Sequence, residues 1–399
     1  MKTQNVFMGI DVGTSAVKAI LVRSDGQISS EASVEQTVVE PHPTWSEQNP
    51  EHWWQNTYTA IKQVIAKCAQ LPYSTYVTGI GITGQMHSAV FLDEFRNIIR
   101  PAILWNDSRT SSQCEEILDS IGMDRLYQEI GNRALEGFTA PKILWLKEYE
   151  PDNYSRLRTV LMPKDYVRYR LTGELGTDES DAAGTILYDV RKQQWSQSFL
   201  KSLDIASEIL PPVLKSTDIC GTLSKFIASD LGLPEGIPVV CGGADNAVGA
   251  VSSGVVVPGH SQSSIGTSGT IFTPVSAPIV GEDMKLHMFS HCVPDMWYLM
   301  GTILSAGNSL KWLRNTFAAD ESYETLVNEA MRIPVGAEGL IFLPYLSGER
   351  TPHNNPNARG VFFGLHTGHS MEHLTRAVLE GVCFALRDSI ELIKILGIS

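Results

Sequence analysis

Two acidic residues lie where an apolar, strand-like run meets small and flexible residues. The first, Asp11, lies inside the apolar run MGIDVG and is followed by the turn Gly13-Thr14-Ser15. A buried carboxylate without a partner is costly, so something must compensate it. One interpretation is that Asp11 holds Mg²⁺ through water while Gly13, Thr14 and Ser15 offer N–H and hydroxyl donors to nucleotide phosphates. The other is an ordinary turn in which the Asp caps local amides.

The second acid is Asp245, in the segment Cys241-Gly242-Gly243-Ala244-Asp245-Asn246. It comes directly after an apolar run, on a backbone that glycine makes adaptable. In phosphoryl transfer a carboxylate in such a place accepts the proton of the attacking hydroxyl and aligns it. We therefore predict that Asp245 is a catalytic base, with an ordinary Asp-Asn turn as the alternative.

Two further segments carry groups that suit a polyol. The run 84–88, GQMHS, places hydrogen-bonding side chains beside an apolar one, and the run 105–107, WND, offers a ring for stacking and polar groups for hydroxyls. A lone His is often structural, and Asn-Asp-Ser also makes a good turn. The candidate sugar contacts are Met86, His87, Trp105, Asn106 and Asp107.

A second small-residue loop repeats the first. Gly266-Thr267-Ser268-Gly269 follows one strand-like run and precedes another, as the turn at 13–15 does. Alone it would be an ordinary hairpin turn, but together the two loops predict two related lobes with similar phosphate-binding character. We place the lobe boundary in the Gly- and Ser-rich stretch near 246–254, so that the lobes span residues 1–247 and 254–399.

The elements that would position these residues alternate between strand and helix patterns. Strands are expected at Phe7–Val12, Val17–Arg23, Thr78–Thr83 and Pro238–Cys241, and helices at Glu51–Gln70 and Met371–Leu396. This interleaving predicts an α/β fold.

Composition narrows the classes of function. A length of 399 residues favours two or three domains, and a net charge of −13 argues against a nucleic-acid groove, which needs clustered Lys and Arg. The six cysteines form no C-x-x-C pair, so neither a zinc site nor a disulfide framework is indicated. The N-terminus lacks a long apolar region and no apolar run reaches about 18 residues. We therefore expect a cytoplasmic protein with no membrane segment.

Ten segments, taken in order, resemble the FGGY family of carbohydrate kinases, and within it the members that act on xylulose. They run from the first strand to the last helix, which makes the resemblance far more specific than any single Gly-rich loop. The segments are MGIDVGTSAVKAIL, WSEQNPEHWW, GQMHSAVF, RPAILWNDSRT, GFTAPKILWLK, MPKDYVRYRLTGE, SDAAGT, GGADNAVGA, SSIGTSGT and LPYLSGERTPHNNPNARGVFFGL.

The resemblance implies two actin-like or hexokinase-like (ribonuclease H-like) lobes that close over a cleft holding ATP and sugar. The implied reaction converts ATP and D-xylulose to ADP and D-xylulose 5-phosphate. A homodimer rests on the resemblance alone. The implied roles are Asp245 as base, Met86, His87 and Asn246 as sugar contacts, Asp11 with Mg²⁺ and phosphates, the loops at 13–15 and 266–269 on phosphates, and Trp105, Asn106 and Asp107 along the sugar side.

The resemblance also implies that the second lobe is incomplete. Family members continue beyond the helix at 371–396 with a strand and a loop of the Gly-Gly-Gly-Ala type that cradles adenosine, whereas this sequence ends at Ser399. We therefore expect this chain to bind sugar better than ATP.

Other functions remain open at this point. One is a different FGGY kinase, for ribulose, gluconate or glycerol, because a few pocket side chains decide sugar preference. Another is a catalytically impaired remnant that still binds sugar. A dehydrogenase is disfavoured, because no G-x-G-x-x-G joins an early strand to a helix.

Overall fold

The computed structural model describes residues 3–71 and 73–398, and its chain divides into two compact units. The first unit is Met1–Ser252 together with Phe289–Met296, and the second is Ser253–Met288 together with Trp297–Ser399. The division at 247 and 254 stays a prediction. The return of residues 289–296 to the first unit was not predicted from the sequence.

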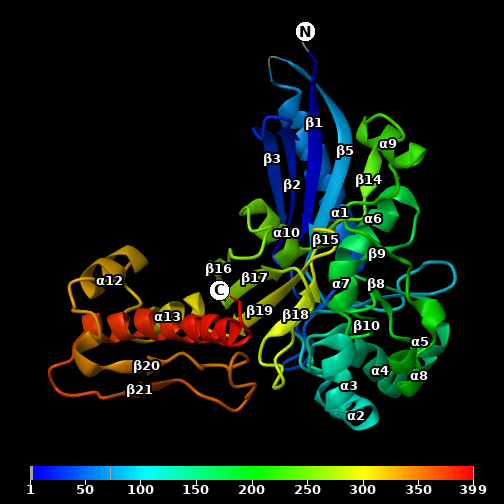
Figure 1. Ribbon diagram of the computed structural model, residues 1–399. Coiled ribbons are helices and arrows are strands. Elements are labelled where there is room, and N and C mark those ends of the chain that lie inside the picture. The colour runs from blue at the N-terminus through cyan, green and yellow to red at the C-terminus, as the bar shows by residue number, and fades with distance from the viewer. Residues whose placement is uncertain (1–2, 72, 399) are drawn as a thin grey trace. The chain divides into compact units, whose positions relative to one another are not determined.

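A long mixed sheet forms the centre of the first unit (Figure 1). The strands β1 (Thr3–Val12), β2 (Ala16–Arg23) and β3 (Ile28–Glu35) form an antiparallel meander, and β5 (Ser74–Gly84) lies parallel to β1 on its other side. The full order is β13-β14-β5-β1-β2-β3, with the short strand β15 also paired to β5.

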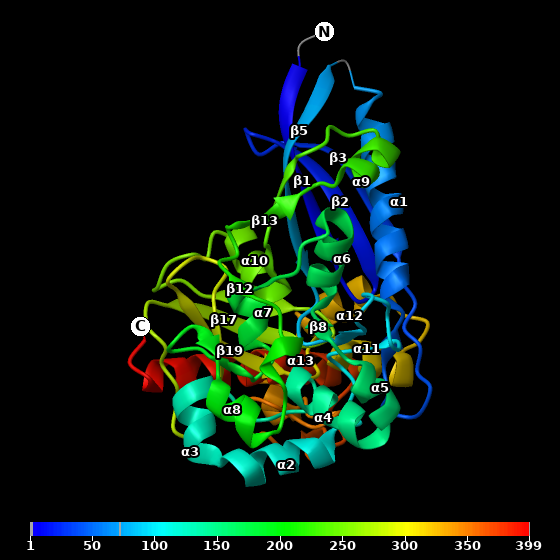
Figure 2. The same cartoon turned by 90° about the vertical axis from the view of Figure 1, so that its right-hand side faces the viewer.

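Alternation of side chains explains why one face of this sheet is buried. Val6, Met8, Ile10 and Val12 of β1 are all buried, as the period of two along a strand requires. The helix α1 (Pro50–Cys68) packs on β2 and β3 and lies along the sheet in Figure 2. It connects β3 to β5, and this helical crossover is what allows β5 to run parallel to β1.

The remaining elements of the first unit surround that sheet or form smaller layers beside it. They are β4 (Glu47–Gln48), β6 (Val90–Leu92), β7 (Ala102–Ile103), α2 (Ser111–Ile121), α3 (Met123–Arg125), η1 (Leu126–Ile130), α4 (Thr139–Tyr149), α5 (Pro151–Arg156), β8 (Thr159–Leu161), α6 (Pro163–Thr172), β9 (Thr177–Asp178), α7 (Glu179–Ala183), β10 (Tyr188–Asp189), β11 (Gln194–Trp195), α8 (Gln197–Ser202), η2 (Ser207–Ile209), β12 (Val213–Leu214), β13 (Ile219–Thr222), α9 (Lys225–Leu231), β14 (Pro238–Val240), β15 (Gly243–Ala244) and α10 (Asp245–Ser252).

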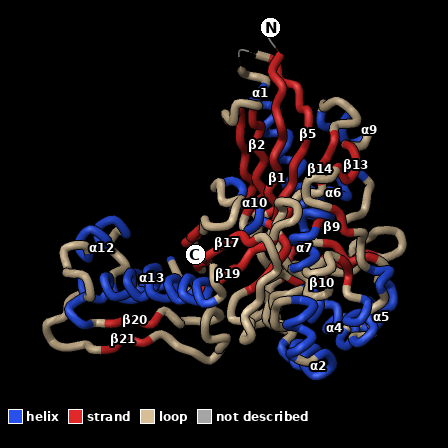
Figure 3. The backbone as a smooth tube through the Cα atoms, in the orientation of Figure 1, coloured by secondary structure: helices blue, strands red, loops and turns tan. Residues whose placement is uncertain are grey.

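The second unit is built on the antiparallel strands β16 (Gln262–Ile265), β17 (Gly269–Val275) and β19 (Trp297–Ile303). The long helix α13 (Met371–Ile395) packs on β17, β19 and β20 (Ile341–Leu343), and Figure 3 shows it as the longest helix of this part of the chain. The other elements are β18 (His287–Ser290), which passes into the first unit, α11 (Gly307–Phe317), α12 (Tyr323–Ala330), η3 (Ala337–Gly339) and β21 (Val361–Phe363).

The structure confirms the predicted α/β class and each of the strands and helices expected from the sequence, with ends that differ by a few residues. Both small-residue loops are hairpin turns of three residues. Residues 13–15 join β1 to β2, and residues 266–268 join β16 to β17. No helix within the described ranges has the length and apolar character needed to cross a membrane.

Candidate active site

The two predicted acids meet at one end of the central sheet. Asp11 is near the end of β1 and pairs in register with Thr83 of β5, and Thr83 pairs in turn with Gly243 of β15. Because β1, β5 and β15 run parallel, their carboxyl ends share an edge. Asp245 follows β15 directly as the first residue of α10, so both carboxylates belong to this edge.

Burial controls the acidity of both groups. Burial and, to a smaller extent, the nearby charge of Asp11 raise the pKa of Asp245 to about 7, against the opposing hydrogen bonds from Asn246. Burial also raises the pKa of Asp11, although Lys18 opposes it. An acid with a pKa near neutrality is suited to exchange a proton at physiological pH.

Asn246 fixes one oxygen of Asp245. Its backbone N–H donates to Asp245 Oδ1 at 2.7 Å and its side-chain Nδ2 donates to the same oxygen at 3.1 Å. The same Nδ2 lies 3.7 Å from Met86 Sδ. The structure therefore brings together two predicted segments, one with the base and its neighbour and the other with a candidate sugar contact.

His87 is held in an unusual backbone conformation beside Met86. Its φ is +66°, and its Nδ1 lies 2.8 Å from the carbonyl oxygen of Gly184. Its own carbonyl oxygen accepts hydrogen bonds from Lys142 Nζ at 2.9 Å and Thr139 Oγ1 at 3.1 Å. Burial lowers the pKa of that lysine to about 7. Strain of this kind persists only where the surroundings fix it, which marks the 86–87 segment as a constrained site.

Gln85 joins the first loop to the sugar-side segments. Thr14 Oγ1 donates to Gln85 Oε1 at 3.2 Å, and Ser88 Oγ donates to the same oxygen at 3.0 Å. The indole Nε1 of Trp105 donates to Thr14 Oγ1 at 2.9 Å, while its backbone N–H donates to Ser88 Oγ at 3.1 Å. Gln85 was not among the predicted site residues. Its position directly before Met86, a predicted sugar contact, could have indicated that it belongs to the site.

Asp107 is turned toward the interior, whereas the neighbouring Asn106 is exposed. The carboxylate of Asp107 is buried, accepts the backbone N–H of Ser46 at 2.6 Å and forms an ion pair with Arg109 at 2.7 Å. Asn106 Nδ2 donates to Ser46 Oγ at 3.0 Å. Direct sugar contact by these two residues stays a prediction, and the bonds present favour a role in holding the segment that carries Trp105.

The second loop belongs to the second unit and is described within it alone. Thr267 is exposed, and its carbonyl oxygen accepts the backbone N–H groups of Ala306 at 2.9 Å and Asn308 at 3.1 Å. Gly266 accepts the N–H of Gly307, the first residue of α11, at 2.8 Å. The loop is thus tied to the start of a helix, and its predicted contact with phosphates stays a prediction.

Asp11 fits the needs of a magnesium ion. Within the described residues its carboxylate accepts no hydrogen bond, and it lines a pocket of about 660 Å³ together with Lys18 and Thr83. No group of three or more His, Cys, Asp or Glu within those ranges could enclose a metal. Mg²⁺ commonly uses one or two carboxylates with water and substrate phosphates, so a single available acid is sufficient.

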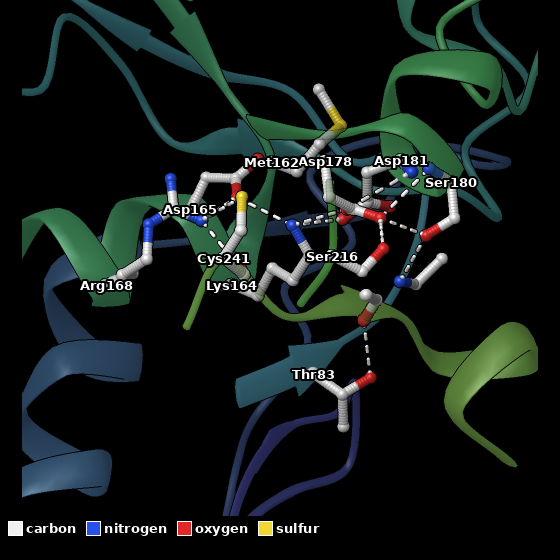
Figure 4. A network of polar contacts seen from close by, with 12 residues as sticks. Thr83, Met162, Lys164, Asp165, Arg168, Asp178, Ser180, Asp181, Ser216 and Cys241 are labelled. Atoms are coloured by element: carbon white, nitrogen blue, oxygen red, sulfur yellow. Dashed lines mark hydrogen bonds and ion pairs between the residues drawn. The ribbon is translucent and has the colours of Figure 1, made fainter. Parts of the chain in front are cut away.

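A buried cluster of charged side chains lies next to Cys241 and Ser180 and was missed by sequence reasoning (Figure 4). Lys164 Nζ is 2.7 Å from Asp165, 2.9 Å from Asp178 and 3.1 Å from Asp181, and Arg168 pairs with Asp165 at 2.7 Å. All five side chains are buried. The motifs MPKDYVRYRLTGE and SDAAGT contain most of them, but their charges alone indicate a solvated helix surface.

Comparison with known proteins matches both parts of the chain to one family. Residues 6–252 match the N-terminal domain of the FGGY family of carbohydrate kinases, and residues 262–398 match its C-terminal domain. The chain belongs to the FGGY family of carbohydrate kinases. This FGGY chain is 43% identical over 390 residues to the xylulose kinase of Bacillus subtilis, covering 98% of this chain and 78% of that one.

Other relatives agree with that match. The xylulose kinase of Escherichia coli is 42% identical, with 98% of this chain and 80% of the relative covered. A kinase structure from Brucella ovis, described as a xyloylose kinase, has a TM-score of 0.92 at 37% identity and covers 99% of this chain and 80% of that one. The two-lobed FGGY sugar kinase fold expected from the resemblance is therefore confirmed.

Gluconate kinase of Lactobacillus acidophilus has the same TM-score of 0.92 at 28% identity, covering 98% of this chain and 79% of that one. The shape of the fold is thus shared by kinases of different sugars and does not distinguish between substrates.

Proposed function

We propose that this FGGY kinase transfers the γ-phosphoryl group of ATP to the terminal hydroxyl of D-xylulose. The observation that carries the chemistry is the placement of Asp245, with its pKa raised to about 7, at the same sheet edge as Asp11. The choice of sugar rests on relatives named xylulose kinases that are 40–43% identical across almost the whole chain.

Asp245 acts as the base in this proposal. Its Oδ1 accepts both hydrogen bonds from Asn246, so Oδ2 is the oxygen that takes the proton of the attacking hydroxyl. That proton moves as the oxygen attacks phosphorus in line and ADP leaves. A pKa close to the working pH allows the carboxylate to accept the proton and release it again.

The groups around Asp245 orient the sugar. Met86 supplies an apolar contact next to Asn246, and His87 is fixed beside it by Gly184 and Lys142. Trp105 is 40% exposed, so its ring face is available for stacking while its indole N–H stays bonded to Thr14. Positioning of this kind supplies a large part of the rate in phosphoryl transfer.

The first loop and Asp11 form the phosphate side of the proposed site. Gly13, Thr14 and Ser15 supply the hairpin backbone, Ser15 adds a hydroxyl donor, and Asp11 would hold Mg²⁺ through water. When bound, Mg²⁺ offsets the negative charge of the phosphate oxygens. Gly266 and Thr267 are proposed as a second group of phosphate contacts.

The test is ADP release by the purified chain with ATP, Mg²⁺ and one sugar at a time from D-xylulose, D-ribulose, gluconate and glycerol. We expect D-xylulose to give the highest kcat/KM, and Asp245→Ala to lose about 10²-fold to 10⁴-fold of the rate. A higher kcat/KM with another sugar would reject the substrate proposed. A rate that survives Asp245→Ala would reject the base.

Two further expectations remain proposals. Homodimer formation is checked by light scattering of the purified chain. A cytoplasmic location is checked by fractionation of cells that express it.

A further inference from the structure

Side chains from outside the turn that leads into Asp245 hold it at Cys241, Gly243 and Ala244. Arg168 Nη1 donates to the carbonyl oxygen of Cys241 at 2.8 Å, and Thr83 Oγ1 donates to that of Gly243 at 2.7 Å. The backbone N–H of Ala244, directly before Asp245, donates to Ser180 Oγ at 2.9 Å. Two of these three contacts come from the buried charged cluster or from a residue bonded to it, as Figure 4 shows.

The cluster sets the direction of the Ser180 hydroxyl. A serine hydroxyl has one hydrogen to give, and Ser180 gives it to Asp178 Oδ2. The lone pairs of its oxygen are therefore left to accept the Ala244 N–H. Asp178 is held in turn by Lys164 Nζ at 2.9 Å and by Ser216 Oγ at 2.7 Å. A continuous chain of contacts thus runs from Lys164 through Asp178 and Ser180 to the residue before the base.

The charged side chains of the cluster face one another without exposure to solvent. Burial, together with repulsion from Asp178 and Asp165, raises the pKa of Asp181 well above its usual value, although the charge of Lys164 opposes this. Two cations, Lys164 and Arg168, face the two carboxylates of Asp165 and Asp178. Buried ion pairs add little stability compared with apolar packing, so a cluster this large calls for a reason other than stability.

The backbone before Asp245 has a geometry that needs such support. Gly242 has a φ of +81°, and a Cβ at this position would overlap the carbonyl oxygen of Ile82. A Cβ on Gly243 would lie 2.7 Å from that of Cys292. The turn therefore depends on two glycines. Because glycine has no Cβ, its backbone is less restricted than that of other residues. Hydrogen bonds from outside the turn are what fix its path.

We propose that Ser180, oriented by Asp178 and Lys164, is a positioning residue that sets the place of the catalytic base Asp245. This inference rests on the proposed function of Asp245 as base. Ser180 does not touch substrate in this proposal. It acts through the Ala244 amide, and a displacement of the base by a fraction of an ångström is expected to lower the rate without weakening sugar binding.

The experiment compares Ser180→Ala with the matched control Ser216→Ala. Both changes remove one buried hydroxyl that donates to Asp178 Oδ2, but only Ser180 also accepts the Ala244 N–H. With D-xylulose, or with the sugar that the wild type prefers, we expect Ser180→Ala to lower kcat about 10-fold to 100-fold while KM for the sugar stays within about threefold. Ser216→Ala should keep kcat within about threefold.

Amide hydrogen exchange provides a readout that does not depend on turnover. In the protein without ligands, the amide of Ala244 should exchange at least about tenfold faster in Ser180→Ala than in Ser216→Ala, because only the first change removes its acceptor. If the wild type phosphorylates none of the sugars, the proposed function fails, and this exchange comparison still decides whether Ser180 holds the turn.

Three results would overturn the inference. Equal kcat values for the two variants would show that the Ala244 contact is irrelevant to the rate. A loss confined to KM would assign Ser180 to sugar binding. Unchanged exchange at Ala244 would show that Ser180 does not hold the turn.

Discussion

Replacement of Asp245 by Asn should stabilise the protein at pH 8 and have a smaller effect at pH 5. The pKa of this carboxyl is about 7 in the folded state and 3.8 ordinarily, so the folded state binds its proton more tightly than the unfolded chain does. The free energy of unfolding of the wild type therefore falls as the pH rises from about 4 to 7, and the full loss is present above 7. An Asn at this position cannot ionise, so the variant does not lose this stability.

The size of the effect follows from the difference in pKa. A difference of about 3 between the folded and unfolded states corresponds to roughly 4 kcal/mol, and partial exposure of the side chain halves this to about 2 kcal/mol. At 2–4 °C per kcal/mol for a unit of this size, the midpoint of thermal unfolding should rise by about 4–8 °C at pH 8. At pH 5 less than half of that gain remains.

The assay is thermal unfolding followed by circular dichroism at both pH values, without nucleotide or metal. Asp119→Asn is the control, because Asp119 is an exposed acid on α2 with no ion pair in the described part of the chain. This control should leave the midpoint unchanged at both pH values. An equal gain at pH 5 and pH 8, or a loss at pH 8, would refute the assignment of a raised pKa to Asp245.

Further outcomes follow from the same site. In the wild type, kcat/KM should rise about tenfold per pH unit below pH 6.5 and level off above about 7, because only the Asp245 carboxylate accepts a proton, and a flat profile contradicts this. Gly242→Ala should cost more than about 3 kcal/mol in urea unfolding, whereas Gly249→Ala, where a Cβ meets nothing within 4 Å, should be neutral or stabilising. Trp105→Phe removes the donor to Thr14 Oγ1 and should raise KM for ATP about threefold to tenfold with KM for xylulose unchanged, which steady-state kinetics will decide. Chelation of Mg²⁺ by EDTA should abolish ADP release but not xylulose binding measured by calorimetry, and retained turnover would remove the metal from the proposal.

The parts of the site that the sequence predicted best are those whose conformation depends on neighbouring residues in the chain. The hairpin at 13–15 and the strand before Asp245 follow from apolar runs that stop at glycine, and such signals need no knowledge of distant partners. The meeting of Asp11 with Asp245 was implied only by the resemblance, because β15 reaches β5 across about 160 residues of chain.

Buried charge was the feature that local pattern concealed. The spacing of Lys164, Asp165 and Arg168 is typical of an exposed helix face. Their burial becomes possible only because another segment supplies acidic partners at 178 and 181. Asp107 lies in a related setting, because its carboxylate pairs with the buried side chain of Arg109, and its contact with sugar stays a prediction. For the cluster around Lys164, the deciding partners come from another segment of the chain.

The buried charges around Lys164 also constrain how this protein can evolve. Loss of any one member removes a partner from the charges that stay buried, which is more harmful than replacement of the whole group by apolar residues. Replacement of the whole cluster therefore requires several substitutions, and the proteins with only some of them are destabilised. Among descendants of this gene, the positions 164, 165, 168 and 178 should accordingly be inherited as a block and change together or not at all.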